Sequence, residues 1–375
     1  MFGIGLNAFV HLIRIIMRIG FAVDRFREDV GMANVVFNLA KQLSETDEVT
    51  VITFEDALSD SLAEKCREKK IKIETVKRSS WLGFYKDIRE KSREIDRMNL
   101  DIISIHGFML ANAAAISDTE TLKTNHAHCL IKEEWRRNPL RLPIWVLEEV
   151  PSVLLADRTI SISKYARNQY RKLYRKDSEV IYNGIDPEDY KPVSEEENKF
   201  EETKSDDKVT LGTLCMLRDY KNIKLVLEAL EDTDREYEYF IGGKGPQKGD
   251  LKQIVNENDI DATFLGFVDE KHIAEFYSML DLFLFPSKWE GFGVPVLESL
   301  ACNTPVAAVD QKGPKEIITD NTGYLLSKDP EDWRSAIEDF KSDQFGDEPR
   351  ERAENFSWDE TSNEYREKIK EITST

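Results

Sequence analysis

Short apolar, β-branched runs alternate with amphipathic stretches along almost the whole chain. The apolar runs predict buried strands, and the stretches between them have the 3.6-residue period of helices. Two series of strands are predicted, the first at residues 18–23, 49–54, 71–76, 102–105, 123–126, 159–162 and 180–182, and the second at residues 209–214, 237–241, 263–267, 282–285, 306–309 and 324–326. This alternation gives parallel sheets with right-handed crossovers, so we predict an α/β fold with two doubly wound, Rossmann-like domains.

A polar break between the two series predicts the domain boundary. Residues 190–208 carry a dense run of Glu, Asp, Lys and Ser with almost no apolar periodicity, as is typical of a linker. We therefore predict a first domain at residues 17–188 and a second at residues 189–356. The last segment, residues 357–375, begins with Ser357 and with Glu360 three residues later, which is the capping-box spacing of a helix start.

Composition limits the partners of the protein. The chain has 375 residues and a formal net charge of −19, so its overall field repels the phosphate backbone and excludes duplex nucleic acid as a partner. The four cysteines have no paired spacing, which argues against a zinc knuckle or a disulfide framework and favours a reducing, cytoplasmic location. They are Cys66, Cys129, Cys215 and Cys302.

The start of the chain is apolar but does not predict a membrane span. His11 and Arg14 interrupt the apolar run, which is also too short to cross a bilayer. The segment has no charged leader and no clear cleavage site, so it does not resemble a signal peptide. We predict that residues 1–16 are an extension outside the folded core, either an early start of translation or an interfacial anchor.

The segment from Glu290 to Glu298 carries the most informative set of binding features. It follows the predicted strand at 282–285 and leads into a helical pattern that begins at Val294. Gly291 and Gly293 let the backbone approach a ligand, and free N–H groups at a helix start suit anionic oxygens. A carboxylate at each end can accept hydrogen bonds from a pair of hydroxyls. The segment therefore predicts a site for a polyol that carries phosphate.

This segment resembles the E-x7-E signature of the family 4 retaining glycosyltransferases, which have the GT-B fold. Other segments resemble motifs of that family in the same order along the chain. The sequence from Ile181 to Asp186 resembles P-N-G-V-D with Tyr182 in place of proline, and the sequence from Gly242 to Pro246 resembles G-x-G-P. Glu316 and the Thr322-Gly323-Tyr324 sequence resemble the closing pattern of the family. The resemblance covers nearly the whole chain from Met17, and it implies that the terminal helix packs back onto the first domain.

The resemblance implies a nucleotide-sugar donor site in the second domain. The first carboxylate and the amides after it would bind hydroxyls of the donor sugar, and the second carboxylate would bind the hydroxyls of the ribose. The donor-binding residues implied in this segment are Glu290, Gly291, Phe292, Gly293, Val294 and Glu298.

The same resemblance implies a binding site for the diphosphate. Lys221 matches the phosphate-binding lysine of the family and would stabilise charge on the leaving group, which makes it catalytic together with Glu290. The companion arginine of the family falls at Met216, a departure, and Arg218 is the candidate to replace it. Gly31 matches the second glycine of a loop that contacts the diphosphate or the acceptor, although a plain helix-entry glycine is an equally good interpretation.

Three histidines follow predicted strands of the first domain. His126 matches the histidine that lies near the reacting anomeric carbon in the family, so the resemblance implies a catalytic residue. His106 ends another predicted strand, and His128 follows His126 in the loop. We assign His106 and His128 to the acceptor side, with a structural histidine as the alternative for each.

No metal and no cofactor is expected. Asp232 and Asp234 match the spacing of a cation-binding D-x-D sequence, but they fall between a predicted helix and the next strand, where turn residues are common. In the GT-B fold, basic side chains and a helix dipole take the place of the metal.

The acceptor is the least determined part of the site. Residues 128–151 combine tryptophans with Lys132, Arg136, Arg137 and Arg141, and residues 165–176 add a second basic cluster. Such a surface suits a lipid-phosphate-linked acceptor and peripheral contact with the inner face of a membrane, but it equally suits a solvated helical surface.

We therefore predict a metal-independent retaining transferase that moves a hexose-type sugar from a nucleotide diphosphate sugar to a hydroxyl of a glycan, a lipid-linked or a small acceptor. Chemistry would take place in a cleft between the domains. Two alternatives remain open. One is a nucleotide-sugar epimerase or sugar phosphorylase of the same fold. The other is a catalytically weak nucleotide-binding homologue, which Met216 and Asn303, in place of the arginine and a glycine of the family, keep open.

Overall fold

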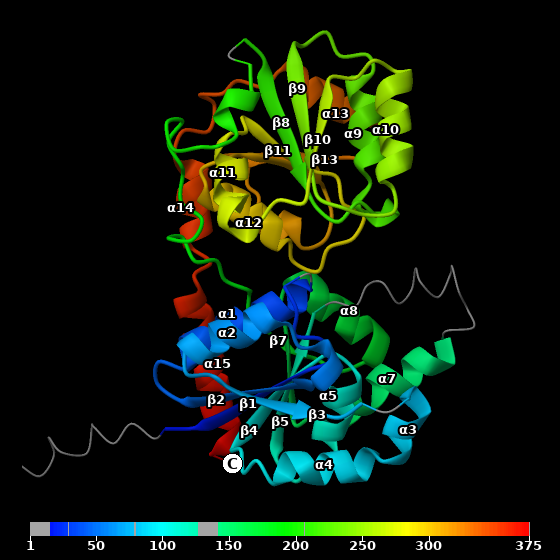
Figure 1. Cartoon of the computed structure of the whole chain (residues 1–375), viewed down its shortest axis with the longest axis vertical. Coiled ribbons are helices and arrows are strands. Elements are labelled where there is room, and N and C mark those ends of the chain that lie inside the picture. Colours follow the sequence, from blue (N-terminus) through cyan, green and yellow to red (C-terminus); the bar gives the residue numbers. More distant parts are fainter. Residues whose placement is uncertain (1–15, 29, 79, 127–141, 206, 375) are drawn as a thin grey trace, which may run out of the picture. The chain divides into compact units, whose positions relative to one another are not determined.

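The computed structural model describes residues 16–28, 30–78, 80–126, 142–205 and 207–374. Cys129, His128 and the basic residues of 128–141 therefore lie outside the described residues, as does the predicted extension apart from Ile16. The chain forms two compact units, one made of Met1–Thr124, Arg141–Thr159 and Glu364–Thr375, and the other of Asn125–Leu140 and Ile160–Asn363. Figure 1 shows the described elements. No described helix is both long enough and apolar enough to cross a membrane.

Two sheets confirm the predicted α/β fold. The first has seven strands in the order β3-β2-β1-β4-β5-β6-β7, and the second has six in the order β10-β9-β8-β11-β12-β13. The strands of the first sheet are β1 (Arg18–Val23), β2 (Glu48–Phe54), β3 (Lys72–Val76), β4 (Ile102–His106), β5 (Glu120–Asn125), β6 (Arg158–Ser161) and β7 (Glu179–Val180). Those of the second are β8 (Val209–Leu214), β9 (Tyr237–Gly242), β10 (Ala262–Gly266), β11 (Leu282–Phe285), β12 (Val306–Val309) and β13 (Gly323–Leu326).

Helices connect these strands, as the alternation predicts. Those between strands of the first sheet are α1 (Gly31–Leu43), α2 (Asp60–Glu68), α3 (Trp81–Lys86), α4 (Ile88–Asp96), α5 (Met109–Ala115), α7 (Leu142–Leu155) and α8 (Lys164–Tyr174). Those between strands of the second are α9 (Ile223–Leu230), α10 (Lys248–Glu257), α11 (Ile273–Ser278) and α12 (Val294–Ala301), and α13 (Pro330–Glu338), α14 (Glu348–Glu354) and α15 (Trp358–Thr373) follow them. Each predicted strand is present, and the largest difference is at β5, which begins three residues earlier, at Glu120.

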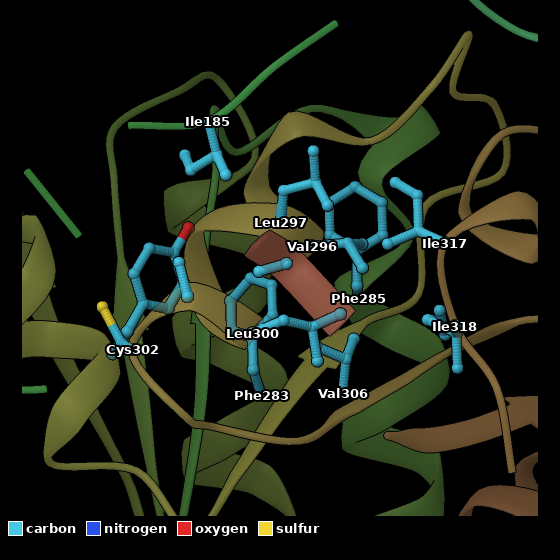
Figure 2. Close-up of a cluster of buried hydrophobic side chains, with 14 of the residues drawn as sticks. Ile185, Phe283, Phe285, Val296, Leu297, Leu300, Cys302, Val306, Ile317 and Ile318 are labelled. Atoms are coloured by element: carbon cyan, nitrogen blue, oxygen red, sulfur yellow. The ribbon is translucent and has the colours of Figure 1, made fainter. Parts of the chain in front are cut away.

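The second sheet buries apolar side chains on both faces. Along β11, Leu282 and Leu284 belong to a core cluster with residues of α9, α10 and α13, whereas Phe283 and Phe285 belong to a second cluster with residues of α11 and α12. The alternation follows from the period of two in a strand. Figure 1 shows these two sets of helices on opposite sides of the sheet, and Figure 2 shows the second cluster, including Phe283 and Phe285. A strand covered on both faces is rigid, so it fixes the start of the loop that follows β11.

Helix α7 contains a proline, and side chains of other helices replace the hydrogen bond that this proline removes from the helix. Pro151 has no N–H, so the carbonyl of Leu147, four residues earlier, loses its helical donor. Asn112 Nδ2 donates to that carbonyl at 3.1 Å, and Tyr85 OH donates to it at 3.4 Å. Asn112 Oδ1 also accepts the N–H of Ser152 at 2.9 Å. These bonds fasten α7 to α5 and α3 at the point where the proline weakens it.

The predicted start of the terminal helix is confirmed. The N–H of Glu360 donates to Ser357 Oγ at 3.1 Å, as in a capping box. Just before this helix, the N–H of Ile185 donates to the carbonyl of Phe356 at 2.7 Å. A Cβ on Gly184 would lie 2.5 Å from the backbone nitrogen of Trp358, so this contact requires the glycine of the Asn183-Gly184 sequence.

Candidate active site

The loop between β11 and α12 presents backbone donors without protein acceptors. Within the described residues, the N–H groups of Gly291, Phe292, Gly293 and Val294 donate to no protein acceptor. Gly293 has φ +112°, which a residue with a side chain rarely adopts, and it is the N-cap of α12. Phe292 is only 2% exposed, and a buried donor without a partner costs about 1–3 kcal/mol. The arrangement suits a ligand whose oxygens accept these hydrogen bonds.

Lys221 and Glu290 form an ion pair beside these donors. Lys221 ends the 3₁₀ turn Asp219–Lys221 that follows β8, and its Nζ contacts Glu290 Oε1. Ser287 Oγ donates to the same carboxylate oxygen at 3.0 Å. Lys221 Nζ also lies 5.3 Å from the ring centroid of Tyr220 and 5.4 Å from that of Phe285. The structure thus brings together the two residues that the resemblance implies as catalytic in the second domain.

The environment keeps Lys221 charged. Burial by itself would lower the pKa of Lys221, but the Glu290 carboxylate outweighs it, and the net pKa is raised above the ordinary value of a lysine. Lys221 therefore offers a fixed positive charge on a largely enclosed stem, where its interactions are less screened than on an open surface.

Glu298, on α12, is held by two tyrosines. Tyr277 OH donates to its Oε2 at 2.9 Å, and Tyr190 OH donates to its Oε1 at 3.2 Å. Burial raises the pKa of Glu298, and the hydrogen bonds from Tyr277 and Tyr190 act against that rise. Sequence reasoning missed both tyrosines. Tyr190 lies at the start of the predicted linker, and no local pattern in its neighbours indicates a carboxylate partner.

The predicted linker is attached to the second unit. The N–H of Val193 donates to Ser278 Oγ at 3.0 Å, and Asn198 Nδ2 donates to the carbonyl of Glu275 at 2.7 Å. These bonds to α11 account for the buried position of Asn198 and fix the segment that follows Tyr190.

The Gly242–Pro246 sequence supports the loop that carries Lys221. A Cβ on Gly243 would lie 1.8 Å from the carbonyl oxygen of Cys215, and one on Gly245 would lie 2.3 Å from that of Leu217. These two glycines are therefore required because the loops after β8 and β9 pass in backbone contact.

Met216 and Arg218 lie next to each other on the surface. Arg218 Nε contacts Met216 Sδ at 2.8 Å, and the Met216 side chain is 40% exposed. The basic side chain that the structure places against Glu290 is that of Lys221, whereas Arg218 is exposed. Whether Arg218 replaces the missing arginine stays a prediction.

His106 lies inside a buried hydrogen-bonded network of the first unit. Its Nε2 lies 2.8 Å from Ser104 Oγ, and Tyr365 OH of α15 lies 2.5 Å from Ser104 Oγ and 2.6 Å from Thr124 Oγ1. Burial lowers the pKa of His106 to about 3, so the ring is neutral at physiological pH. The ring is 0% exposed, and it contacts Ser104, which together with Thr124 joins β4 and β5 to Tyr365 of α15.

The other candidates of the first domain are less constrained. His126 directly follows β5 and is partly buried, whereas His128 lies outside the described residues. Gly31 is the first residue of α1, and a Cβ added there would meet nothing within 4 Å. Packing therefore does not require a glycine at this position, and the contacts of Gly31 with a diphosphate or an acceptor stay a prediction.

The aspartates with the spacing of a cation site have other partners. Asp232 lies in the turn after α9 and accepts from Arg334 at 3.3 Å, and Asp261, which forms a second D-x-D sequence with Asp259, pairs with Lys208 at 2.6 Å. Among the described residues, no group of three or more His, Cys, Asp or Glu side chains is arranged to hold a metal ion.

Two family models match this chain. The model described as Glycosyltransferase Family 4 matches residues 30–189, and the model described as Glycosyl transferases group 1 matches residues 194–357. The second match contains the loop between β11 and α12, and the first contains His106, His126 and Gly31.

Relatives and solved structures agree with these matches. The O-antigen biosynthesis glycosyltransferase WclY of Escherichia coli is 27% identical over 293 residues, which are 77% of this chain and 79% of that protein. The O-antigen chain mannosyltransferase RfbU of Salmonella typhimurium is 28% identical over 196 residues, which are 51% of this chain and 52% of that protein. The crystal structure of Anabaena HepE in complex with UDP and glucose shares the fold, with a TM-score of 0.80 and 17% identity over 95% of this chain and 100% of that chain. Because the two models together match residues 30–189 and 194–357, this chain belongs to the family 4, or group 1, glycosyltransferases, a family of enzymes with the GT-B fold.

Proposed function

We propose that this glycosyltransferase moves a hexose-type sugar from a nucleoside diphosphate sugar to an acceptor hydroxyl, with retention of the anomeric configuration and without a metal ion. The observation that carries the proposal is the loop between β11 and α12. Its N–H groups without protein acceptors fall in the sequence between Glu290, which pairs with Lys221, and Glu298, which lies on α12. Each part of the donor finds a chemically suited partner there.

Glu298 would accept hydrogen bonds from the ribose diol, and Glu290 with the loop amides would bind hydroxyls of the sugar. Lys221 would stabilise the negative charge that develops on the diphosphate as it leaves. Arg218 and Gly31 are the further candidates for diphosphate contacts. No metal ligand is invoked, because the lysine charge and the start of α12 supply positive potential.

In the transfer step, the bond between the anomeric carbon and the phosphate oxygen breaks. The acceptor oxygen bonds to the same face of that carbon, which retains the configuration. The proton of the acceptor hydroxyl goes to the departing phosphate oxygen, so charge and atoms balance. We propose that His126 lies near the anomeric carbon in this step, with His128 on the acceptor side.

The names of relatives suggest where to look for donor and acceptor. HepE was solved with UDP-glucose, and a relative from Mycobacterium tuberculosis, 33% identical over 35% of this chain, is named a GDP-mannose-dependent alpha-(1-6)-phosphatidylinositol dimannoside mannosyltransferase. For this chain we propose a UDP- or GDP-linked hexose and an acceptor that is a glycan or is lipid-linked.

Peripheral contact with a membrane on its cytoplasmic side would suit a lipid-linked acceptor. The described part of the chain exposes large apolar side chains on α7 and α3, where Leu147 is 52%, Leu154 58% and Leu82 73% exposed. Burying such side chains in a membrane interface is favourable, so these helices are the proposed contact surface.

A donor panel tests the proposal. UDP-glucose, UDP-N-acetylglucosamine, UDP-galactose and GDP-mannose are compared with UDP and GDP for the rise in melting temperature, since a ligand that binds the folded state stabilises it. The donor that binds is then incubated with and without acceptor and chelator, and the anomer of the product is determined by NMR. We expect transfer that chelator leaves unchanged and a product with the anomeric configuration of the donor. Inversion, or loss of activity with chelator, would contradict the corresponding part of the proposal.

Met216 favours one second candidate, a catalytically weak nucleotide-binding homologue. The family arginine at this position is absent, and the nearest arginine is exposed. In the donor panel, this candidate predicts nucleotide binding with neither transfer nor hydrolysis. Conversion of the donor without any acceptor would instead indicate an epimerase.

A further inference from the structure

The peptide that joins Gly291 to Phe292 is held by a residue far away in the sequence. Ser163 Oγ donates to the carbonyl of Gly291 at 2.6 Å, across 128 residues of sequence. A trans peptide is planar, so the carbonyl of one residue and the N–H of the next point in opposite directions. The bond that fixes the Gly291 carbonyl toward Ser163 therefore also fixes the Phe292 N–H on the other side of the peptide.

The Ser163 hydroxyl has a determined direction. Ser163 is the N-cap of α8, and its Oγ accepts the N–H of Ala166 at 2.9 Å. The N–H of Ala166 can only donate and the carbonyl of Gly291 can only accept, so the single proton of the Ser163 hydroxyl goes to Gly291. Ser163 is 0% exposed, so water does not compete for either bond.

Glu316 holds the start of α8 in place. Its carboxylate accepts the N–H of Lys164 at 2.8 Å and that of Tyr165 at 2.7 Å, and Tyr182 OH donates to it at 3.0 Å. A carboxylate at a helix N-terminus satisfies free donors and interacts favourably with the helix dipole. The hydroxyl that orients the loop is thus itself held by several bonds.

The other sides of the Phe292 residue are also enclosed. A Cβ on Gly313 would lie 2.3 Å from the Cα of Phe292 and 2.5 Å from its nitrogen, so only glycine fits there. The ring of Tyr182 stacks on that of Phe292, with centroids 5.6 Å apart and an interplanar angle of 29°. Tyr182 stands where the family pattern has proline, so this chain stabilises the loop with a ring that the pattern does not supply.

We propose that Ser163 is a positioning residue that sets the Gly291–Phe292 peptide and so directs the Phe292 N–H toward an oxygen of the donor sugar. The inference rests on the proposed function and adds to it the residue that orients the sugar-binding amide. Ser163 touches no substrate and acts through Gly291. Its contribution therefore falls on the sugar part of the donor and not on the nucleotide part.

The test separates the sugar from the nucleotide. For Ser163→Ala, we expect the calorimetric affinity for the nucleoside diphosphate, UDP or GDP as the panel decides, to change by less than twofold. Affinity for the matching nucleotide sugar should fall at least fivefold, and kcat should fall as well. Ser163→Thr keeps a hydroxyl and should recover most of both losses. A loss that is equal for nucleotide and nucleotide sugar, or no loss at all, would overturn the proposal.

Controls separate positioning from capping. Ser59 caps α2 in the first unit by accepting the N–H of Leu62 at 3.4 Å, and its side chain also bonds the Glu28 carboxylate, so Ser59→Ala removes a helix cap and one local bond. It should lower the melting temperature without changing the ratio of nucleotide-sugar to nucleotide affinity. If Ser163→Ala does not fold, Ser163→Gly serves instead, because glycine is a better N-cap residue than alanine and also lacks the hydroxyl. A parent protein that binds no nucleotide sugar would overturn the proposed function itself, and this inference with it.

Discussion

Both sheets consist of parallel strands, yet the polar groups at their carboxyl ends differ in whether they have hydrogen-bonding partners within the protein. In the first sheet, the ends of β4 and β5 carry His106 and Thr124, and Tyr365 of α15 lies within hydrogen-bonding distance of Ser104 and Thr124. In the second sheet, the loop after β11 leaves a row of N–H groups without protein acceptors. The first arrangement is satisfied within the protein, whereas the second leaves donors that water or a ligand can satisfy.

This difference distinguishes polar groups that are hydrogen-bonded within the protein from groups that are open to a ligand. Both regions hold buried or partly buried polar side chains, and both have pKa values shifted by burial. What differs is the presence of unused hydrogen-bonding groups, since buried donors are normally paired. A histidine at the end of a strand is therefore weaker evidence of a site than a backbone donor without an acceptor.

From this comparison we expect the largest loss of activity for a substitution of Lys221. Lys221→Ala removes the positive charge beside the loop and should lower turnover about 10²–10³-fold, the usual cost of losing one group that stabilises transition-state charge. Steady-state transfer assays with circular dichroism as a check on folding measure this. Lys315→Ala is the matched control, because Lys315 pairs with Asp310 on an exposed surface at 2.6 Å. Turnover near that of the parent in Lys221→Ala would place the phosphate site elsewhere.

The next effect concerns the second carboxylate. Glu298→Ala should weaken nucleotide-sugar binding by about 1.5–3 kcal/mol, the range for hydrogen bonds to a charged group. Tyr190→Phe removes one of the two hydroxyls that bind Glu298. It should lower the affinity for both the nucleotide and the nucleotide sugar, but by less than Glu298→Ala. Calorimetric titration measures both variants. Unchanged donor affinity in Glu298→Ala would show that Glu298 serves only to bind the two tyrosines.

The buried network around His106 in the first unit should make the stability of the protein depend on pH. The pKa of His106 is about 3 in the folded protein, below the value near 6.5 of an unfolded chain, so below pH 6.5 only the unfolded state takes up this proton. The free energy of unfolding should therefore decrease as the pH falls, by about 2 kcal/mol between pH 6.5 and 5, because the buried ring stays neutral in the folded state. His106→Gln should remove that part of the pH dependence in urea titrations. His272→Gln is the control, because His272 pairs with Glu275 outside this network. An identical pH dependence in parent and His106→Gln would show that the ring takes up a proton without unfolding.

The smallest effect is expected at Arg218. Its guanidinium is exposed and contacts Met216, so Arg218→Ala should lower turnover only about two- to fivefold, as solvent screens an exposed charge. The same transfer assay measures it. A loss as large as that of Lys221→Ala would instead assign Arg218 the role of the missing arginine, and Met216→Arg on that background should then restore part of the activity.

The sequence by itself determined the parallel α/β architecture and the position of the loop after β11. It did so because apolar periodicity, helix caps and glycine conformations are local properties that each segment expresses on its own. The Ser357 cap and the left-handed Gly293 are examples. It also indicated Glu290, Glu298 and Lys221, since these match a pattern of residue types at fixed spacing.

Only the tertiary structure decided which side chains support those residues. Tyr190 reaches Glu298 across 108 residues, Ser163 reaches Gly291 across 128, and Tyr365 reaches Ser104 across 261. The tertiary structure also decided that His106 is buried. Its position at the end of β4 does not show this, because the loop that carries Glu290 likewise follows the end of a strand, β11. Partners of this kind depend on how separate elements pack, and no property of either segment alone encodes the distance between them.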